Sequence, residues 1–378
     1  MLCTQDAFAT IDRRARRCYR SLIGHSLAFV FPGQGSQAVG MGRGVFEGSA
    51  RARETFEEAD DVLGYKVSDL CFSGPAEDLG DTRIAQPAIL TTSIAILEAM
   101  AEAATGALGR ITSGAEPRGV AALPAPIRPA FVAGHSLGEF SALAAAGVLS
   151  FSDTLRLVSE RGRLAATKGA KGVMAAILGL TAEEVERVIA ETVPQGATVV
   201  ANDNGPSQVT IAGDEQSVTR VSEALTRYGA RRVVMLRISG PFHFPPMGRI
   251  GDELGAFMGT LRFREPVVPV VANVTAAPHQ SGASIPDTLV RHLSQRVEWL
   301  RSVRFMVERG ASTFVEIGAG QVVNGLVKRI ADVTTVNVSD PPSIASALRA
   351  FDLPARADAL AEAARAIAAR RTGWGPKG

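Results

Sequence analysis

The sequence predicts an α/β fold in which a parallel sheet carries a second, ferredoxin-like unit inserted into the chain. Two short apolar segments, 26–31 (SLAFVF) and 128–134 (RPAFVAG), each run through glycine-rich turns into a helical pattern, as strands of a parallel sheet do. Residues 172–238 alternate as strand, helix, strand, strand, helix, strand, which is the split ferredoxin-like order. With 46% hydrophobic residues, a chain of 378 residues can bury a substantial core.

The larger unit is predicted to contain three further helices and a loop, which lie between its first two strands and after the second. Helical patterns predict helices over 51–63 and 87–104, the second beginning at Pro87, a favourable residue for a first turn. Residues 105–129 are rich in Gly and Pro and predict a surface loop or insertion. A further helix is expected over 151–168.

The inserted unit has clear start and stop signals. Thr181 and Glu184 have the spacing of a capping box before its first helix, and Gly229 follows the last residue of its second. The chain then returns to the larger unit, where 313–318 reads as a strand leading into a helix over 321–330. The strands of the inserted unit are predicted at 172–180, 197–202, 207–213 and 231–238, and its helices at 181–192 and 214–229.

The two ends of the chain differ from the regular middle. The basic stretch DRRARRCYRSLIG has no Trp and little apolar area, which favours a loose peripheral extension over a helix lying on an anionic surface. The Ala-rich end predicts an amphipathic helix packed on the protein or frayed. The predicted division is an extension at 1–26, a large unit at 27–171 plus 239–345, a small unit at 172–238 and a helical tail at 346–378.

Charge and cysteine content exclude several classes of protein. A net charge of +2 gives no field that would make nucleic acid the main partner. The odd number of cysteines, Cys3, Cys18 and Cys71, without close spacing argues against a disulfide framework and a zinc site and suits a reducing compartment. No apolar run of about 18 residues and no secretory signal stand out. We therefore expect a cytoplasmic protein with no membrane partner and no metal.

Ser136 is the strongest candidate for a reactive residue. It lies between two glycines in the stretch GHSLG (134–138), with an apolar strand before it and the helical pattern 139–149 after it. That strand-turn-helix setting exposes a serine hydroxyl on a sharp turn above a helix N-terminus, which favours developing negative charge. The setting favours a nucleophile over a serine in a simple tight turn.

A serine nucleophile needs a base, and the chain offers five histidines. His243 follows the last strand of the inserted unit in the Pro-bounded loop SGPFHFPPM, at a junction of the kind that commonly lines clefts. His292 reads as an ordinary helix residue. We favour His243 as the base over a histidine merely satisfied by hydrogen bonds. No Asp or Glu stands out as its orienting partner, and a backbone carbonyl can fill that role.

Arg161 interrupts an apolar stripe of the helix 151–168, because it falls between Leu157 and Leu164. A cation on a buried face needs an anionic partner, and the planar guanidinium suits a carboxylate. That partner is either an acid of this chain or a carboxylate on a ligand, and a nucleophilic Ser136 favours the ligand. The solvated face of the same helix has an expected i, i+4 pairing among Arg156, Glu160 and Arg163.

Ordered motifs along the chain carry a family resemblance. They are FPGQGSQAVGMG (31–42), QPAIL (86–90), GHSLGEFSAL (134–143), ERG (160–162), PFH (241–243) and EIGAGQVVNGLVKR (316–329). Together they resemble the motifs of malonyl-CoA:acyl carrier protein transacylases and the related acyltransferases of polyketide synthesis, over about residues 27–345. The resemblance implies an α/β-hydrolase-like large domain with an inserted ferredoxin-like small domain.

The resemblance also implies roles for particular residues. Ser136 would be the acylated nucleophile and His243 its general base and acid, while Arg161 would hold the malonyl carboxylate. His292, where Gln is often found, would orient His243 through its main-chain carbonyl. The remaining implied residues are Gln34 and Leu137, whose backbone N–H groups would form the oxyanion hole, and Gln86, near the acyl site.

Substrate choice is implied by the residues around the histidine. Phe242 precedes it, as in malonyl-type members, whereas methylmalonyl-type members tend to have Ser there. A pocket too tight for a branched extender is therefore expected. Pro241 replaces the usual small residue and Ala165 stands where Met is common, so other extender units remain an alternative.

The expected activity is ping-pong transfer of a malonyl group from malonyl-CoA to the phosphopantetheine thiol of an acyl carrier protein through an acyl-serine. We expect a monomer whose coenzyme A thioester is a substrate, with no further cofactor, serving fatty-acid or polyketide synthesis. The alternatives are an acyl hydrolase or esterase of the same fold, and a catalytically silent docking protein. Arg161 distinguishes the malonyl transferase from the first alternative, because a hydrolase for neutral acyl chains needs no buried cation.

Overall fold

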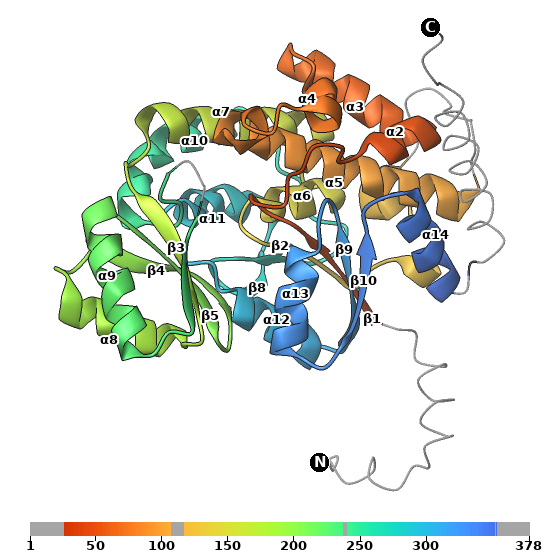
Figure 1. The fold of residues 1–378 in the computed structure, drawn as a ribbon. Helices are drawn as coiled ribbons and strands as arrows, with labels where there is room; N and C mark the ends of the chain where they lie inside the picture. Colours follow the sequence, from red (N-terminus) through yellow and green to blue (C-terminus); the bar gives the residue numbers. More distant parts are fainter. Residues whose placement is uncertain (1–25, 107–116, 237–239, 352, 354–378) are drawn as a thin grey trace, which may run out of the picture.

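The computed structural model describes residues 26–106, 117–236, 240–351 and 353 (Figure 1). The predicted N-terminal extension, apart from its last residue, lies outside this part of the chain. So do residues 107–116 of the predicted loop and the Ala-rich helix predicted near the C-terminus.

A six-stranded sheet forms the centre of the larger unit, with the order β10-β9-β1-β2-β7-β8. Five strands run parallel, and β8 at one edge is antiparallel to β7. The bounds are β1 Ser26–Phe31, β2 Phe131–Gly134, β7 Val270–Ala272, β8 Ala277–Pro278, β9 Ala311–Ile317 and β10 Thr334–Val338. The predicted α/β fold class with a mainly parallel sheet is confirmed.

Helices cover both faces of this sheet, which explains why its strands are apolar throughout. On β1, Phe29 and Phe31 pack into the core shared with α5 Thr82–Thr105, α6 Gly138–Ala145 and α7 Phe151–Lys168. Ala28 and Val30 point the other way, into a second core with α12 Trp299–Glu308 and α13 Val322–Ile330. The other helices are α2 Arg43–Gly48, α3 Ala50–Leu63, α4 Val67–Ser73, α10 Gly251–Met258, α11 Ile285–His292 and α14 Pro341–Ala350, with short 3-10 turns at Asp78–Gly80, Pro245–Ile250 and Gly282–Ser284.

Helix α5 begins earlier than the sequence predicted. Asp81 caps it by accepting a hydrogen bond from the Arg83 N–H at 2.8 Å, so Pro87 lies inside the helix and the predicted start there was wrong. The capping carboxylate is the stronger start signal, because it satisfies a free N–H of the first turn. This helix is long and apolar enough to cross a membrane, but 94% of its most apolar window is buried within the protein.

The segment after residue 116 was predicted as a surface loop, and its described half is an irregular segment with exposed residues such as Arg118 and Arg128, but it also buries apolar side chains that the prediction did not foresee. Residues 117–129 form two short 3-10 turns, Gly119–Ala122 and Ala125–Ile127. Val120, Leu123 and Ile127 in this segment are at most 1% exposed. Composition alone could not reveal this, because the segment is held by partners far away in the sequence.

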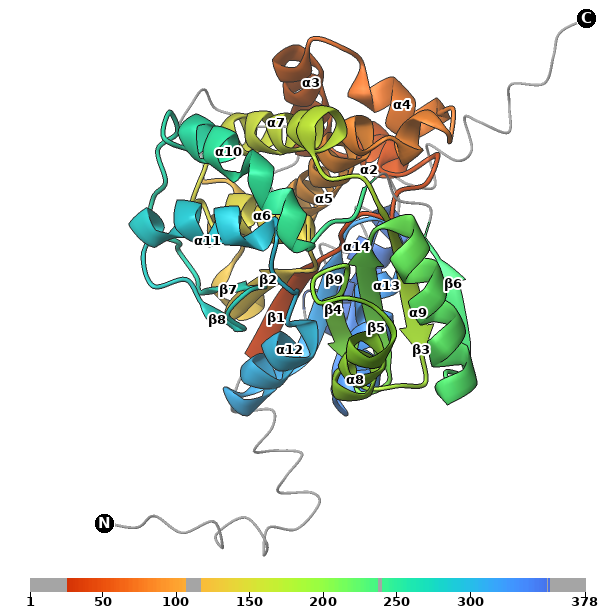
Figure 2. The ribbon, with the colours of Figure 1, turned by 90° about the vertical axis from the view of Figure 1, so that its left-hand side faces the viewer.

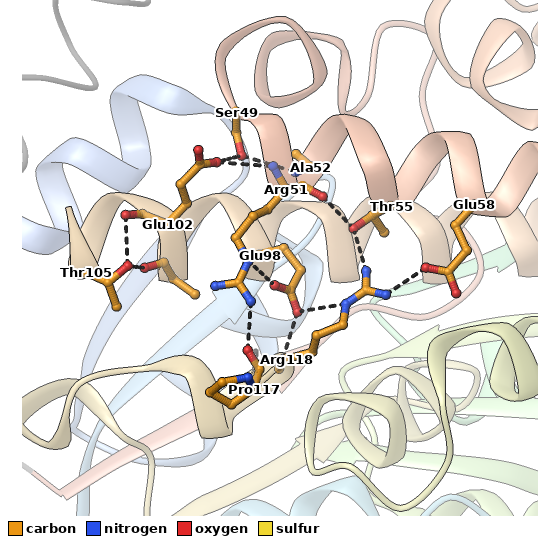
Figure 3. A network of polar contacts seen from close by, with 12 residues as sticks. Ser49, Arg51, Ala52, Thr55, Glu58, Glu98, Glu102, Thr105, Pro117 and Arg118 are labelled. Carbon is orange, nitrogen blue, oxygen red and sulfur yellow. Dashed lines mark hydrogen bonds and ion pairs between the residues drawn. The ribbon is translucent and has the colours of Figure 1, made fainter. Parts of the chain in front are cut away.

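A buried polar network fixes that segment to the helical layer (Figure 3). Glu98 on α5 accepts the Gly119 N–H at 2.7 Å and pairs with Arg51 of α3 at 3.1 Å. Arg51 also donates to the Pro117 carbonyl at 2.7 Å, and Arg118 pairs with Glu58 at 2.7 Å. Burial raises the pKa of Glu98, although the charge of Arg51 acts in the opposite direction. The carboxylate therefore joins two helices to a segment that has no regular structure of its own.

Glu98→Ala is expected to lower the free energy of unfolding by about 3 kcal/mol, since it leaves the Gly119 N–H and the Arg51 guanidinium without their buried acceptor. Denaturant unfolding followed by circular dichroism measures this. Glu186→Ala is the matched control, because Glu186 pairs with Arg296 but its side chain is 53% exposed. The control should lose less than about 1 kcal/mol. Equal losses in the two variants would contradict the role given to Glu98.

The smaller unit has a four-stranded antiparallel sheet with the order β4-β5-β3-β6 and two helices on one side (Figure 2). The capping box of Thr181 and Glu184 and the helix end at Gly229 are confirmed. The last strand ends at Met235, before the end predicted for it, and 237–239 lie outside the described residues. The bounds are β3 Val173–Leu178, α8 Ala182–Thr192, β4 Thr198–Gly205, β5 Gln208–Gly213, α9 Glu215–Tyr228 and β6 Arg232–Met235.

The two units contact each other through β4. The Asp203 N–H donates to the Val297 carbonyl at 2.9 Å, and the Val297 N–H donates to the Ala201 carbonyl at 2.9 Å. Val297 lies just before α12 of the larger unit. This short parallel bridge joins the smaller sheet to the segment just before α12.

Candidate active site

Ser136 lies in a sharp turn between β2 and α6, as its sequence setting predicted. Its φ of 52° is in the left-handed region, which is uncommon for residues other than glycine. The flanking glycines allow the chain to fold this tightly. A Cβ on Gly134 would lie 1.8 Å from the Gly138 carbonyl carbon, and a Cβ on Gly138 would lie 2.1 Å from the Phe31 carbonyl oxygen.

His243 lies directly against this serine, from a position 107 residues further along the chain. Its Nε2 is 2.7 Å from the Ser136 Oγ, and its Nδ1 is 2.9 Å from the His292 carbonyl oxygen. A carbonyl oxygen only accepts, so Nδ1 must carry the proton, and Nε2 is left as an acceptor for the serine hydroxyl. The backbone N–H of His243 also donates to the Leu293 carbonyl at 3.1 Å. The histidine is thus held from two sides by the end of α11.

The buried imidazole is strongly biased toward its neutral form. Burial, together with the positive charge of Arg161, lowers the pKa of His243 to about 3. A neutral imidazole is the form that can accept a proton from Ser136 at neutral pH. The same surroundings make the protonated imidazole costly, so a negative charge arriving near Arg161 would make His243 a better base.

Asn273 holds the serine turn in place, and the sequence analysis missed it. Its Oδ1 accepts the Ser136 N–H at 2.7 Å, and its Nδ2 donates to the Gly134 carbonyl at 2.6 Å. The Asn273 N–H in turn donates to the buried carboxylate of Glu139 at 2.9 Å. A signal was present, because Asn273 directly follows the apolar residues of β7, at the carboxyl end of a parallel strand.

The backbone N–H groups of Gln34 and Leu137 flank the serine turn. Gln34 lies in the loop after β1, and this loop approaches the turn so closely that a Cβ on Gly33 would be 2.3 Å from the His135 carbonyl oxygen. Leu137 immediately precedes α6. Within the described ranges, neither N–H has an acceptor. Two free donors near a serine hydroxyl suit the oxygen of a tetrahedral intermediate.

The guanidinium of Arg161 lies in the same region and is 1% exposed, so its predicted burial is confirmed. It packs over the rings of Phe140 and Phe242, at 5.5 Å and 4.9 Å from their centroids. Its Nη1 donates to Gln86 Oε1 at 2.7 Å, whereas Nε and Nη2 have no partner among the described residues. Burial lowers the pKa of Arg161 to about 10, against the opposing charge of Glu139.

No carboxylate of the described chain forms an ion pair with Arg161. The buried acid in its surroundings, Glu139, instead accepts from Asn273 and lies 3.0 Å from Nε2 of His279. Elsewhere on α7 the exposed pairs are Arg163 with Glu160 and Arg156 with Asp153. These are i, i+3 pairs, so the expected i, i+4 pairing was wrong. The buried guanidinium therefore keeps two nitrogens, Nε and Nη2, without an acceptor among the described residues.

The remaining histidines and cysteines are engaged elsewhere or not described. His135 points away from the serine hydroxyl, with its Nε2 2.6 Å from Asn204 Oδ1 on β4 and its ring against Trp299. Burial raises the pKa of the Cys71 thiol to about 12, so this cysteine is a poor nucleophile. Among the described residues, no group of three or more His, Cys, Asp or Glu could hold a metal ion. His25, Cys3 and Cys18 lie outside them.

Comparison with known proteins gives a consistent result. The acyl transferase domain family matches residues 28–340. The malonyl CoA-acyl carrier protein transacylase of Bacillus subtilis is 39% identical over 327 residues, which cover 85% of this chain and 96% of that protein.

Solved structures agree with the sequence relatives. The acyl-carrier-protein-S-malonyltransferase from Bartonella henselae aligns with a TM-score of 0.77 at 38% identity, covering 86% of this chain and 99% of that one. A malonyl-transacylase solved in complex with its type II PKS acyl-carrier protein aligns with a TM-score of 0.76 at 36% identity, with the same coverage.

Proposed function

This chain belongs to the acyl transferase domain family, among the malonyl CoA-acyl carrier protein transacylases, and we propose that it moves a malonyl group from malonyl-CoA to the phosphopantetheine thiol of an acyl carrier protein. The observation that carries the proposal is a buried guanidinium with two unpartnered nitrogens, Nε and Nη2 of Arg161, in the same site as the Ser136–His243 pair. A free carboxylate on the acyl group supplies the acceptors that the protein does not.

In the first half-reaction, Ser136 attacks the thioester carbonyl while His243 takes its proton through Nε2. The carbonyl oxygen becomes negative and is held by the N–H groups of Gln34 and Leu137, each worth about 3 kcal/mol in comparable sites. The C–S bond then breaks, and coenzyme A leaves as a thiol with the proton from His243. The product is a malonyl ester on the serine.

In the second half-reaction the roles reverse. The phosphopantetheine thiol gives its proton to His243 and attacks the ester carbonyl. The same two N–H groups hold the oxygen, and His243 returns the proton to Ser136 as the C–O bond breaks. The His292 carbonyl keeps the imidazole tautomer correct throughout, since it binds the Nδ1–H in both charge states. The His292 ring also packs edge-on against the His243 ring, with 4.8 Å between the ring centroids, and its Nε2 lies 3.4 Å from Asn273 Oδ1.

Arg161 and its neighbours select the acyl group in this proposal. The guanidinium binds the malonyl carboxylate, and Gln86 fixes the guanidinium through Nη1. Phe242 is 5% exposed and packs against the guanidinium, so it restricts the space beside the acyl carbon and disfavours a branched extender unit. Binding of the carboxylate also neutralises the charge that weakens His243 as a base.

The wider organisation of the protein is part of the proposal. We place the large domain at residues 27–171 plus 239–345 and the small domain at 172–238, with the serine from the first and the histidine from the loop that follows the second. We also propose that the protein works as a cytoplasmic monomer without a bound cofactor or metal. Neither nucleic acid nor a membrane is its partner in this proposal.

Intact-mass measurement after incubation with acyl-CoA tests the function. Malonyl-CoA is expected to give a single malonyl adduct, which peptide mapping should assign to the peptide that contains Ser136. The adduct should disappear when holo carrier protein, which bears the phosphopantetheine thiol, is added. Acetyl-CoA and methylmalonyl-CoA should label the protein much more slowly. Release of free malonate without transfer would instead identify a hydrolase, and the absence of any adduct would contradict acyl transfer altogether.

A further inference from the structure

A continuous line of hydrogen bonds connects Arg161 with the loop after β1. Arg161 Nη1 donates to Gln86 Oε1 at 2.7 Å, and Gln86 Nε2 donates to Thr82 Oγ1 at 2.7 Å. The Thr82 hydroxyl then donates to Gln34 Oε1 at 3.2 Å. Thr82 is the one member of this line for which the sequence analysis gave no role.

The direction of every bond in this line is fixed by the guanidinium. Arginine has no acceptor, so the Gln86 amide must turn its oxygen to Arg161 and its nitrogen to Thr82. The Thr82 oxygen is then an acceptor, and its own proton is available for Gln34. Gln34 Nε2 has no partner among the described residues, so this bond is what orients the Gln34 side chain.

Thr82 is in a rigid position for this task. It is the first residue of α5, and it is fully buried, as is Gln86 one turn later. Helix α7 approaches it so closely that a Cβ on Gly162 would lie 2.9 Å from the Thr82 carbonyl oxygen. Gly162 is the neighbour of Arg161, so the helix that carries Arg161 packs directly against the start of α5, where Thr82 lies.

We propose that Thr82 is a positioning residue that couples the carboxylate site at Arg161 to the oxyanion donor on the Gln34 loop. This rests on the proposed function. Through Gln86, Thr82 holds the guanidinium that binds the acyl carboxylate. Through its own hydroxyl it holds the Gln34 side chain, on the loop whose backbone N–H donates to the thioester oxygen. The two ends of a malonyl group are thereby bound at a fixed separation.

Thr82→Val keeps the shape of the side chain and removes both hydrogen bonds. The malonylation rate constant of Ser136, measured by quenched-flow mass spectrometry, is expected to fall about tenfold because an oxyanion donor is no longer held in place. The malonyl-CoA concentration at half-maximal rate should change less than about threefold, since Arg161 keeps its charge. Thr82→Ser, which retains the hydroxyl, should restore most of the rate.

Thr91→Val is the matched control, because Thr91 is on the same helix, is also fully buried, and its hydroxyl has no partner among the described residues. It should malonylate at the wild-type rate. The proposal is overturned if Thr82→Val reacts as fast as wild type, if Thr82→Ser is as slow as Thr82→Val, or if Thr91→Val slows the reaction equally. A wild-type protein that forms no malonyl adduct would overturn the proposed function instead.

A double-mutant cycle with Arg161→Ala tests the coupling itself. Acetyl-CoA is the substrate, because it carries no carboxylate for Arg161 to bind. The charge of Arg161 still acts on His243, but Thr82→Val leaves that charge in place, so the cycle isolates the effect carried by Gln86 and Thr82. Thr82→Val should slow acetylation about tenfold in the wild-type background and less than about threefold when Arg161 is already absent. Equal effects in the two backgrounds would show that Thr82 acts on Gln34 alone, and the proposed coupling would be wrong.

Discussion

Ser136→Ala is expected to abolish the malonyl adduct and to lower transfer to the carrier protein by about 1,000-fold or more. The Ser136 Oγ is the oxygen that lies 2.7 Å from the neutral nitrogen of His243, on a turn that Asn273 clamps from both sides. Alanine removes the attacking atom and leaves this frame intact. Intact mass and a radiolabel transfer assay measure the two losses separately.

Ser141→Ala is the control for this experiment. Ser141 lies on α6, directly behind the serine turn, and it is fully buried with no partner for its hydroxyl among the described residues. Its substitution should leave the adduct and the transfer rate within about twofold of wild type. A full malonyl adduct on Ser136→Ala would assign the nucleophile to another residue and would contradict the proposed mechanism.

The central pair of the site could be predicted from the sequence because its signals are local. The apolar strand, the two glycines and the helix that surround Ser136 occupy consecutive positions, and His243 stands in a distinctive loop. Asn273 had no comparable signal. It follows a strand of three residues and contacts Ser136 across 137 positions of the chain. Only the pairing of β7 with β2 in the sheet brings the two residues together.

The errors in the fold have a related cause. Pro87 was given too much weight as a helix start, because its cost inside α5 is offset by burial of nearly the whole helix. The Gly- and Pro-rich segment from 117 onward was judged by its composition. Distant partners on α3 and α5 bury it, among them Glu98 on α5 and Arg51 on α3, and its apolar side chains join the main core. Local sequence propensity determines neither the position of Pro87 inside α5 nor the burial of this segment, because both depend on contacts with residues far away in the sequence.

The electrostatics of the site depend on Arg161, a buried cation that forms no ion pair with any described residue, although the charge of Glu139 acts on it from a distance. Arg161 is packed between aromatic rings, and its positive charge lowers the pKa of both His243 and His292 beyond the effect of burial. Holding a buried charge without an ion-pair partner is costly for a folded protein. The arrangement is reasonable when a substrate brings the missing negative charge, and it makes the cation the group that separates malonyl from neutral acyl chains.

Arg161→Ala is expected to lower the second-order rate constant for malonylation by about 30-fold to several thousand-fold, which corresponds to about 2–5 kcal/mol for loss of one partner in a buried charge pair. Labelling by acetyl-CoA should not fall, because an acetyl group has no carboxylate to bind. The preference for malonyl-CoA over acetyl-CoA is therefore expected to shrink or reverse. Parallel intact-mass time courses with the two thioesters measure this ratio.

The pH profile gives a second, independent signature of the same substitution. Arg161 lowers the pKa of His243, so removing the cation raises that pKa toward its ordinary value. His243 must be neutral to accept the serine proton, and the acidic limb of the acetylation profile should move to higher pH in Arg161→Ala. Arg163→Ala, on the same helix but exposed and paired with Glu160, should change neither the profile nor the substrate ratio. Equal loss of malonyl and acetyl labelling in Arg161→Ala, with no shift of the limb, would reduce Arg161 to a structural residue and remove the basis for a dicarboxylic substrate.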